Sequence, residues 1–421
     1  MPSDTPLVLI GVGDSAAYRA DTLSSIAARH PVVAVERSVP TWARPYLVDV
    51  IDADLTDAAA VTAAVSTYNR AHAIGGVLAY MEHHVQTAAV VAQLLGLPGS
   101  SPQSMAACRD KVLSRRLLAE RTVPSARSVQ ASTPESAVAL AEMIGYPVIV
   151  KPRSLAGSAG VRRADCAAAV REAFDEARQA TVMDLHRYGP AGVLIEEYLA
   201  GAEISVETAV LGPGRVRILA VTRKLPAPSG TTQEYGHCVD ARDPLLSDPR
   251  LIQLIESAVA AHGITLGVLC IEVKLTPGGP RIVEVNGRLG GDLLPVLVRR
   301  ATGIDLAQVA ADLATGVPPR LQPVLQRAAA IAFAYPTTSG TLQQLAVHPG
   351  RSHVPGLERM VLTHTPGVHV SAPARATLAD RLAHWVVLGA SADECRTRLA
   401  QAAALLDTRI AQPAHAPACT T

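Results

Sequence analysis

The chain has 421 residues, of which 49% are hydrophobic and 18% charged, and its formal net charge is +1. At roughly 100–200 residues per domain, this length predicts two to four domains with a sizeable core. The near-neutral charge gives no electrostatic case for nucleic acid, and the two phenylalanines offer few stacking platforms for bases. No apolar run reaches the roughly 18–20 residues that span a bilayer. We therefore expect neither a nucleic-acid partner nor a membrane segment.

The six cysteines indicate a reducing compartment. They are scattered and form no CxxC pair: Cys108, Cys166, Cys238, Cys270, Cys395 and Cys419. The N-terminus enters an apolar stretch at Leu7 with no basic segment before it, so no signal peptide is indicated. We expect reduced thiols in a cytoplasmic protein.

The first hundred residues alternate short apolar runs with helical patterns. Strands are predicted at 7–11, 32–36 and 75–79, and helices at about 20–29, 57–70 and 85–95. This alternation is typical of a parallel sheet covered by helices. The turn after the first strand, Gly11 to Ala16, lacks the third glycine of a dinucleotide fingerprint, so we interpret it as a tight turn.

A second unit begins near residue 104 and alternates in the same way. Its predicted elements are a helix opening at Thr133 and ending at Gly145, a strand at 147–150, a loop at 154–160, a helix capped by Asp165 and running to about Gln179, strands at 193–195, 204–211 and 216–222, a helix at 249–262, and a hairpin of 267–275 with 280–286. From about 326 the pattern is strand-rich and ends with a helix at 392–406. The expected units are 1–103, 104–325 with a subdomain at about 115–200, 326–410, and a disordered tail at 411–421.

The strongest chemical signal is Glu272 followed by a strand that carries Glu284, Asn286 and Arg288. Alternation along a strand places the last three side chains on one face. Two carboxylates and an amide oxygen on a rigid sheet form the hard oxygen site that Mg²⁺ or Mn²⁺ prefers. Arg288 can hold a phosphoryl group or a carboxylate through two parallel hydrogen bonds. The alternative, an exposed strand with paired charges, is a poor account of four polar residues among apolar neighbours.

Two lysines and a loop of small residues form a second signal. Lys151 ends an apolar strand, where a lysine is costly without an anionic partner, and Lys111 begins a helical stretch. Gly157, Ser158 and Gly160 let backbone N–H groups approach a phosphate closely. Each lysine alone would be read as a surface residue, but together with the loop they predict a phosphate cradle, although no Walker A motif is present.

A third and weaker signal is the acidic segment that follows the strand at 193–195. Glu196, Tyr198 and Leu199 form an extended hinge that can read an adenine edge. Glu203 could accept hydrogen bonds from ribose hydroxyls. Acidic residues are common after strands, so this segment indicates a nucleotide site only in combination with the segments before and after it.

The order and spacing of these segments closely resemble the ATP-grasp superfamily over about residues 104–320. The resemblance implies α/β and α+β architecture: an ATP-grasp fold with an N-terminal Rossmann-like (pre-ATP-grasp) domain and a strand-rich C-terminal lid. It implies ATP as cosubstrate, held by Lys111, Lys151, Gly157, Ser158, Glu196, Tyr198, Leu199 and Glu203. It implies a metal at Glu272 and Glu284 with Asn286 assisting, and an acyl phosphate and tetrahedral intermediate stabilised by Arg288.

Within that superfamily, three features are similar to the L-amino-acid ligases. They are Glu82, the segment from Glu234 to His237, and Arg288-Leu289-Gly290-Gly291-Asp292. In that group the matching acids and histidine contact the substrate's amino end and the incoming amine. At the position of Asp292, some of these ligases carry a bulky aromatic residue that limits the size of the first amino acid. The aspartate here departs from that pattern, so the resemblance does not identify the first substrate.

A lone histidine is usually structural or solvated, but Thr231, Thr232 and Gly236 indicate an ordered polar loop around His237. With Arg288, His237 is therefore a predicted catalytic residue, as the general base near the acyl phosphate. His83 and His84 are expected to be exposed helix residues rather than part of the pocket wall.

The resemblance implies an ATP-dependent carboxylate–amine ligase that joins amino acids through an acyl phosphate and releases ADP and phosphate. The alternatives are a biotin-carboxylase-like or phosphoribosylamine-type enzyme of the same fold, and a non-catalytic ATP-binding protein. The expected partners are small amino-acid or carboxylic-acid substrates. A homodimer is a further expected assembly. The sequence names neither the acid nor the amine.

Overall fold

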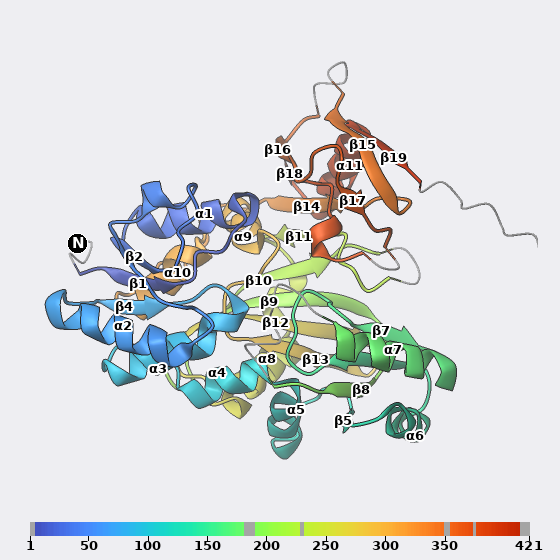
Figure 1. Cartoon of the computed structure of the whole chain (residues 1–421), viewed down its shortest axis with the longest axis horizontal. Helices are drawn as coiled ribbons and strands as arrows, with labels where there is room; N and C mark the ends of the chain where they lie inside the picture. The colour runs from blue at the N-terminus through green and yellow to red at the C-terminus, as the bar shows by residue number, and fades with distance from the viewer. Residues whose placement is uncertain (1–4, 181–189, 228–230, 349–353, 374–375, 413–421) are drawn as a thin grey trace, which may run out of the picture.

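The computed structural model of the chain describes residues 5–180, 190–227, 231–348, 354–373 and 376–412. These residues form four β-sheets with helices against them (Figure 1). None of the helices in these ranges is both long and apolar enough to cross a membrane.

The N-terminal sheet is parallel, with the strand order β3-β2-β1-β4. Its elements are β1 (Leu7–Ile10), α1 (Ala16–Ala27), β2 (Val32–Val35), β3 (Asp49–Ile51), α2 (Ala58–Ala71), β4 (Gly76–Leu78) and α3 (Val85–Leu94). Helix α1 lies on one side of the sheet, and α2 and α3 lie on the other (Figure 1). Strands β1 and β2 are completely buried, as parallel strands covered on both faces are. The predicted parallel sheet is confirmed, although α1 begins four residues before its expected start.

The second sheet is antiparallel and small, with the order β5-β8-β6-β7. Its elements, with the two helices that lead into it, are α4 (Pro102–Arg109), α5 (Lys111–Glu120), β5 (Ser128–Ala131), α6 (Pro134–Ile144), β6 (Val148–Pro152), β7 (Arg162–Ala164), α7 (Ala167–Gln179) and β8 (Val193–Glu197). Thr133 caps α6 as predicted, in a capping box with Ser136. Asp165 does not cap α7, because its carboxylate accepts hydrogen bonds from Arg163 and the N-cap residue is Cys166.

The largest sheet is antiparallel and has the order β13-β12-β9-β10-β11-β14-β18-β16. Its strands are β9 (Ala202–Val210), β10 (Val216–Lys224), β11 (Gly236–Asp240), β12 (Gly267–Thr276), β13 (Gly279–Asn286), β14 (Ala328–Ala334), β16 (Leu357–Leu362) and β18 (Ala383–Gly389). The helices packed on it are α8 (Pro249–Ala261), α9 (Leu294–Thr302), α10 (Leu306–Ala314) and α11 (Ala392–Ala403). The predicted hairpin is β12 with β13, which pair from Cys270 with Asn286 to Thr276 with Gly279.

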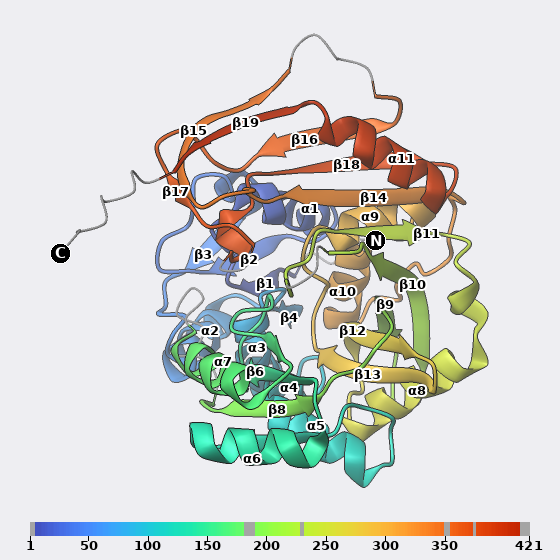
Figure 2. The same ribbon diagram turned by 90° about the vertical axis from the view of Figure 1, so that its right-hand side faces the viewer.

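The C-terminal strands continue this sheet. Strand β14 pairs with β11 on one side and β18 on the other, so the sheet passes from the central part of the chain into the last ninety residues without a break (Figure 2). A separate three-stranded sheet lies beside it, formed by β15 (Gly340–Val347), β17 (His369–Val370) and β19 (Leu406–Ala411). Ala411 therefore belongs to a strand rather than to the expected disordered tail, and residues 413–421 of that tail lie outside the described residues.

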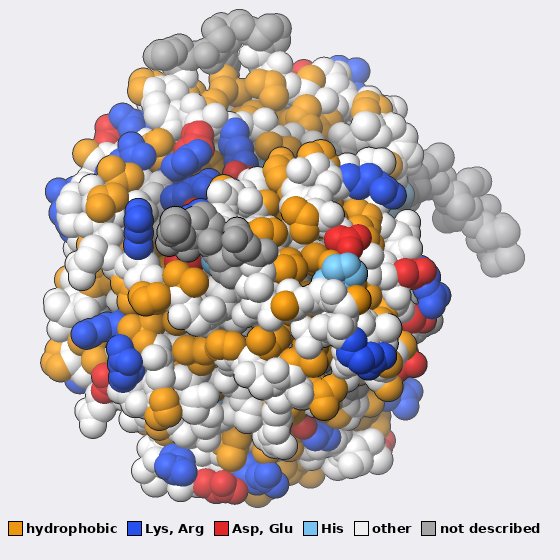
Figure 3. Space-filling model, turned by 90° about the vertical axis from the view of Figure 1, so that its left-hand side faces the viewer, with side chains coloured by type: hydrophobic (Ala, Val, Ile, Leu, Met, Phe, Trp, Pro, Cys, Tyr) orange, Lys and Arg blue, Asp and Glu red, His pale blue; other side chains and the backbone are white. Residues whose placement is uncertain are grey.

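The N-terminal sheet is connected to helix α10 through the buried Asp312. Asp312 on α10 is fully buried and lies 2.9 Å from His30 Nε2 and 3.3 Å from Arg29 Nη1, just beyond the end of α1. On the face of the molecule drawn in Figure 3, Lys and Arg side chains stand among Asp, Glu and apolar side chains rather than in one continuous strip.

Candidate active site

The strand register gathers the polar side chains on one face of the eight-stranded sheet. Ser205 on β9, Glu272 on β12 and Glu284 on β13 stand side by side in one row across the strands. Glu207, Cys270 and Asn286 form the next row, two residues along each strand and so on the same face. The interpretation of Glu272, Glu284 and Asn286 as one cluster agrees with this register.

Lys224, which the sequence analysis missed, lies at the centre of the acidic residues. Its Nζ is 2.6 Å from Glu234 and 3.2 Å from Glu272, and it also pairs with Glu203. Burial would lower the pKa of Lys224, but the three carboxylates outweigh it and raise that pKa well above its ordinary value. Its signal in the sequence was a lysine at the end of an apolar strand, the same signal that singled out Lys151.

A second buried cluster joins the small sheet to the large one. Glu196 lies 2.6 Å from Lys151 Nζ and 2.8 Å from Arg115 Nε, and all three residues are less than 9% exposed. Arg115 and Lys151 outweigh burial and lower the pKa of Glu196 to about 2. Lys111 Nζ lies 2.9 Å from Glu284 and donates to the carbonyl of Leu155 at 2.7 Å. Lys111 and Lys151 therefore both lie near Glu284, and Arg115, which the sequence analysis missed, lies one turn after Lys111 on α5.

The donor set on β12 and β13 fits a divalent cation. Burial raises the pKa of Glu272 to about 7, helped by the carboxylates of Glu203 and Glu284 and opposed by Lys224. Burial acts in the same direction on Glu284, but Lys111 and Lys151 outweigh it and lower its pKa. Asn286 donates its amide N–H to the carbonyl of Cys270 at 3.2 Å, which leaves its side-chain oxygen for another partner. Two half-buried carboxylates that repel each other beside an amide oxygen match the preference of Mg²⁺.

Glu82 and Arg288 form a direct pair. Glu82 is buried and lies 2.6 Å from Arg288 Nε, with Arg109 Nη1 at 3.5 Å from its other oxygen. The expectation that His84 is exposed is wrong: it is 2% exposed, because it packs into the space beside Gly11, and burial lowers its pKa to about 3. His83 is half-buried, and burial with the nearby Arg109 lowers its pKa to about 4.

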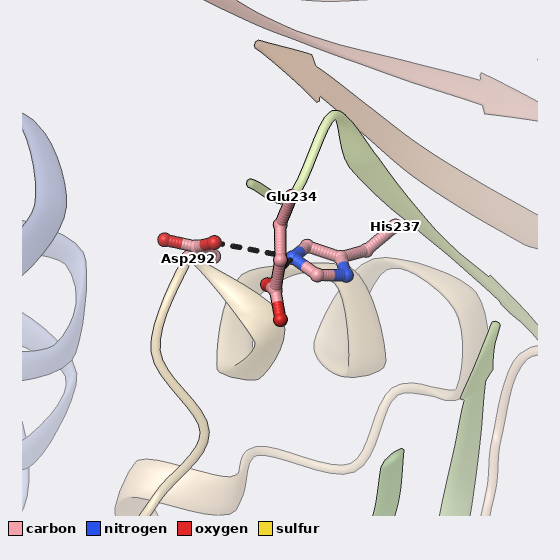
Figure 4. Close-up of side chains that lie close together, drawn as sticks. All are labelled: Glu234, His237 and Asp292. Carbon is pink, nitrogen blue, oxygen red and sulfur yellow. Dashed lines mark hydrogen bonds and ion pairs between the residues drawn. The ribbon is translucent and has the colours of Figure 1, made fainter. Parts of the chain in front are cut away.

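His237 sits between two carboxylates rather than in the expected loop, because it belongs to strand β11. Figure 4 shows Glu234 and Asp292 directed at the same ring nitrogen, Nε2, at 3.0 and 3.2 Å. Burial would lower the pKa of His237, but Glu234 and Asp292 outweigh it and raise the pKa to about 9. The three donor atoms lie within 4.8 Å of one another, which is also the spacing of a metal site. Lys224 on Glu234 and a second cation on Asp292 already neutralise both carboxylates, so we interpret the group as a charged histidine between two acids.

That second cation is Arg381, which lies 89 residues after Asp292 and was missed by the sequence analysis. Its two Nη atoms bind the two carboxylate oxygens of Asp292 at 2.6 and 2.8 Å, and its Nε donates to the hydroxyl of Tyr335 at 2.9 Å. The guanidinium carbon lies 3.7 Å from the centre of the Phe333 ring, and the side chain is 2% exposed. No local motif marks Arg381, because its role arises only when β18 joins the sheet.

Backbone strain accompanies these contacts. Asp292 and Leu293 both have positive φ angles, 52° and 61°, which non-glycine residues rarely adopt. Gly291 before them has open space around its Cα, whereas a Cβ on Gly290 would lie 3.1 Å from the carboxylate of Glu207. The segment 290–293 is therefore held in one sharp turn at the edge of the cluster.

The proposed nucleotide loop also has a left-handed turn. Gly157 and Ser158 have φ angles of 65° and 58°, and a Cβ on Gly157 would lie 2.6 Å from Leu378. Leu199 in the hinge is buried, while Tyr198 stacks under the guanidinium of Arg163 at 4.6 Å. Glu203 binds Lys224 and, at 3.1 Å, Lys274. Lys111 contacts the loop at Leu155 and Lys151 contacts the hinge at Glu196, so the two lysines connect both segments to the polar face of the large sheet.

Comparison with known proteins agrees with this architecture. Residues 144–296 match the family model of the ATP-grasp domain, a segment that begins before β6 and ends in α9. The chain contains an ATP-grasp domain. The crystal structure of an L-amino acid ligase from Bacillus licheniformis superposes with a TM-score of 0.80 at 20% identity, covering 97% of this chain and 99% of that one. At this identity the likeness establishes the ATP-grasp fold.

Two relatives extend the comparison in sequence. An uncharacterized protein y4rH of Sinorhizobium fredii is 26% identical over 90% of this chain and 78% of its own length. Human carnosine synthase 1 is 26% identical over 59% of this chain, but the match spans only 31% of that protein. The ATP-grasp part of this chain is therefore similar in sequence to that of an ATP-grasp ligase.

Proposed function

We propose that this protein is an ATP-dependent carboxylate–amine ligase that joins two amino acids and releases ADP and phosphate. The observation that carries the proposal is the polar face that brings Glu272, Glu284 and Asn286 together with Lys111 and Lys151 in one cluster of an ATP-grasp fold. This arrangement contains cations for a triphosphate and hard oxygen ligands for a metal.

The lysines would bind the nucleotide phosphates and replace water around their negative charge. In the structure each lysine is held by a carboxylate, Lys111 by Glu284 and Lys151 by Glu196, so both are fixed in position before nucleotide arrives. The loop with Gly157 and Ser158 would close over the phosphates, and the hinge with Leu199 would contact adenine.

The metal would be held by Glu272, Glu284 and Asn286. When bound, Mg²⁺ neutralises phosphate charge and orients the nucleotide. It would also remove the repulsion between the two half-buried carboxylates. The remaining steps rest on the side chains of this chain.

Arg288 would hold the reacting carboxylate and stabilise the negative charge of the tetrahedral intermediate. Glu82 lies 2.6 Å from Arg288 Nε and would fix its orientation, a role beyond the contact with an ammonium group that the sequence predicts. No side chain needs to act as a covalent nucleophile, because the substrate carboxylate attacks the γ-phosphorus of ATP. Catalysis is then mainly positioning and charge neutralisation.

The group of Glu234, His237 and Asp292 would face the incoming amine. An ammonium group binds carboxylates, and a proton must leave it before attack. With a pKa near 9, His237 is protonated at neutral pH. Lys224 and His237 outweigh burial and lower the pKa of Glu234 to about 2, and Arg381 holds the pKa of Asp292 well below its ordinary value, so neither carboxylate is an effective proton acceptor. His237 would accept the proton only when deprotonated, which ties turnover to its titration.

A second candidate is a carboxylase-like enzyme of the same fold, for which bicarbonate would be the acid. The carboxylates of Glu82 and Glu234 favour an amino-acid substrate instead. They would attract an ammonium group, whereas they would repel bicarbonate. No feature of the described residues marks a surface for a carrier protein.

The test is a screen of amino-acid pairs with ATP and Mg²⁺, with phosphate release as the readout and products identified by mass. We expect a dipeptide together with ADP and phosphate for at least one pair. AMP and pyrophosphate would refute the acyl-phosphate mechanism. Phosphate release with bicarbonate, but with no amino-acid pair, would favour the carboxylase.

A further inference from the structure

One cation at the edge of this site has no anionic partner. Arg19 lies in the second turn of α1, with its Cγ 3.4 Å from the point where a Cβ on Gly13 would lie, and its guanidinium carbon lies 5.8 Å from the centre of the Tyr80 ring. Across the described ranges, no carboxylate comes within 4 Å of its nitrogen atoms, and its side chain is only half-buried. A partly buried guanidinium without a carboxylate is costly unless another anion binds there.

The neighbouring arginines differ from Arg19 in this respect. Arg288 and Arg109 share Glu82, and Arg381 is bound by both oxygens of Asp292. Burial lowers the pKa of Arg19, and Arg288 contributes in the same direction while Tyr80 and Asp292 oppose it. Near Arg288, three arginines, Arg19, Arg109 and Arg288, therefore share the single carboxylate of Glu82.

The backbone beneath Arg19 is held in place. The Tyr80 hydroxyl donates to the carbonyl of Val12 at 2.8 Å, and the Val12 amide donates to Glu36 at 2.6 Å. Met81, next to Tyr80, packs against Gly13 and leads directly to Glu82, the partner of Arg288. The turn that positions α1 is thus joined to the residues of the candidate active site, and Arg19 projects from a rigid support.

We propose that Arg19 binds a second carboxylate of a substrate, one that is not activated by ATP. A planar guanidinium forms two parallel hydrogen bonds to a carboxylate, and Arg288 is already committed to the reacting one. The inference rests on the proposed ligase function and assigns a residue that would hold the carboxylate that is not activated. The second carboxylate is either the α-carboxylate of the amine substrate or the side-chain carboxylate of the acid substrate.

The experiment compares wild type, Arg19→Gln, Arg19→Lys and the control Arg70→Gln, whose arginine is exposed on α2 and hydrogen-bonded to Thr67. Each is assayed with an accepted amine substrate as the free acid and as its carboxamide, and with aspartate against asparagine as the acid substrate. We expect wild type to prefer one carboxylate-bearing form by about 10–100-fold in kcat/KM, mainly through KM, as loss of a charged hydrogen bond predicts. Arg19→Gln should abolish that preference, Arg19→Lys should keep part of it, and Arg70→Gln should keep all of it.

The substrate whose preference disappears identifies the source of the carboxylate. If Arg19→Gln slows acid and amide forms equally, Arg19 supports the fold around Tyr80 and the proposal is overturned. If no amino-acid pair drives phosphate release in wild type, the ligase function fails first. Calorimetric titration of a free amino acid and its carboxamide then tests Arg19 directly, and equal affinities of both compounds for wild type would overturn the carboxylate site.

Discussion

Removing the Glu234 carboxylate should bring the pKa of His237 back toward its ordinary value. His237 Nε2 lies 3.0 Å from Glu234 and 3.2 Å from Asp292, and the first of these carboxylates contributes most to the raised pKa. The substitution Glu234→Gln keeps the size of the side chain and removes its charge. Lys224 retains Glu203 and Glu272 as partners, so the change should not leave a buried lysine unpaired.

The magnitude follows from linkage between proton binding and folding. Raising a pKa from 6.5 to about 9 corresponds to about 3 kcal/mol of stabilisation of the protonated form. Because the pKa is higher in the folded state, this stabilisation is fully present below the unfolded value of 6.5 and is lost as pH rises through about 9. Between pH 6.5 and about 9, the titration of His237 should therefore lower the free energy of unfolding of wild type by at most about 1.4 kcal/mol per pH unit.

Two measurements check this reasoning. Imidazole resonances followed by NMR against pH, assigned with His237→Gln, should give a midpoint near 9 in wild type and a lower one in Glu234→Gln. Urea unfolding between pH 6.5 and 9 should show a smaller pH-dependent loss in the variant. A wild-type midpoint near 6.5, or identical pH slopes for both proteins, would refute the charge balance described for this group.

Three further substitutions test the other clusters. Glu284→Gln should lower kcat by more than about 100-fold at saturating Mg²⁺ with the circular dichroism spectrum unchanged, while Glu120→Gln, which removes an exposed glutamate paired with Arg116 on α5, should keep normal activity. Glu196→Gln leaves Lys151 and Arg115 buried without their carboxylate and should cost about 3–5 kcal/mol in urea unfolding; a loss below 1 kcal/mol would contradict the assigned burial. Asp312→Asn should cost about 1–3 kcal/mol without changing the KM for ATP, and an altered KM would show that α10 also shapes the cleft.

The sequence was most informative where chemistry and local pattern coincide. The hairpin of β12 and β13 was predicted from two apolar runs around a Pro-Gly turn, and its alternation placed Glu284 and Asn286 on one face. Lys151 was identified because a lysine at the end of an apolar strand needs an anion. The fold class followed from the order of such segments, and its predicted architecture is confirmed by the sheets of the structure.

What was missed depends on contacts between distant segments. Arg381 has no local signature, and its bond to Asp292 exists only because β14 and β18 extend the large sheet. His237 was assigned to a loop because β11 is short and is surrounded by small polar residues, whereas pairing with β10 and β14 makes it a strand. His84 was expected to be exposed because its burial depends on the free space beside Gly11, which no helical pattern reveals.

The position of β11 between β10 and β14 bears on how this protein can be shortened. A chain that ended near residue 325 would lose β14, so the backbone N–H and C=O groups of β11 that β14 now pairs would face solvent. Such an open edge invites pairing with another copy and aggregation, and it would also release the strand that holds His237. Strands β14 and β18 are therefore part of the same folding unit as the central strands of the eight-stranded sheet, and a shortened form of this protein will have to retain both.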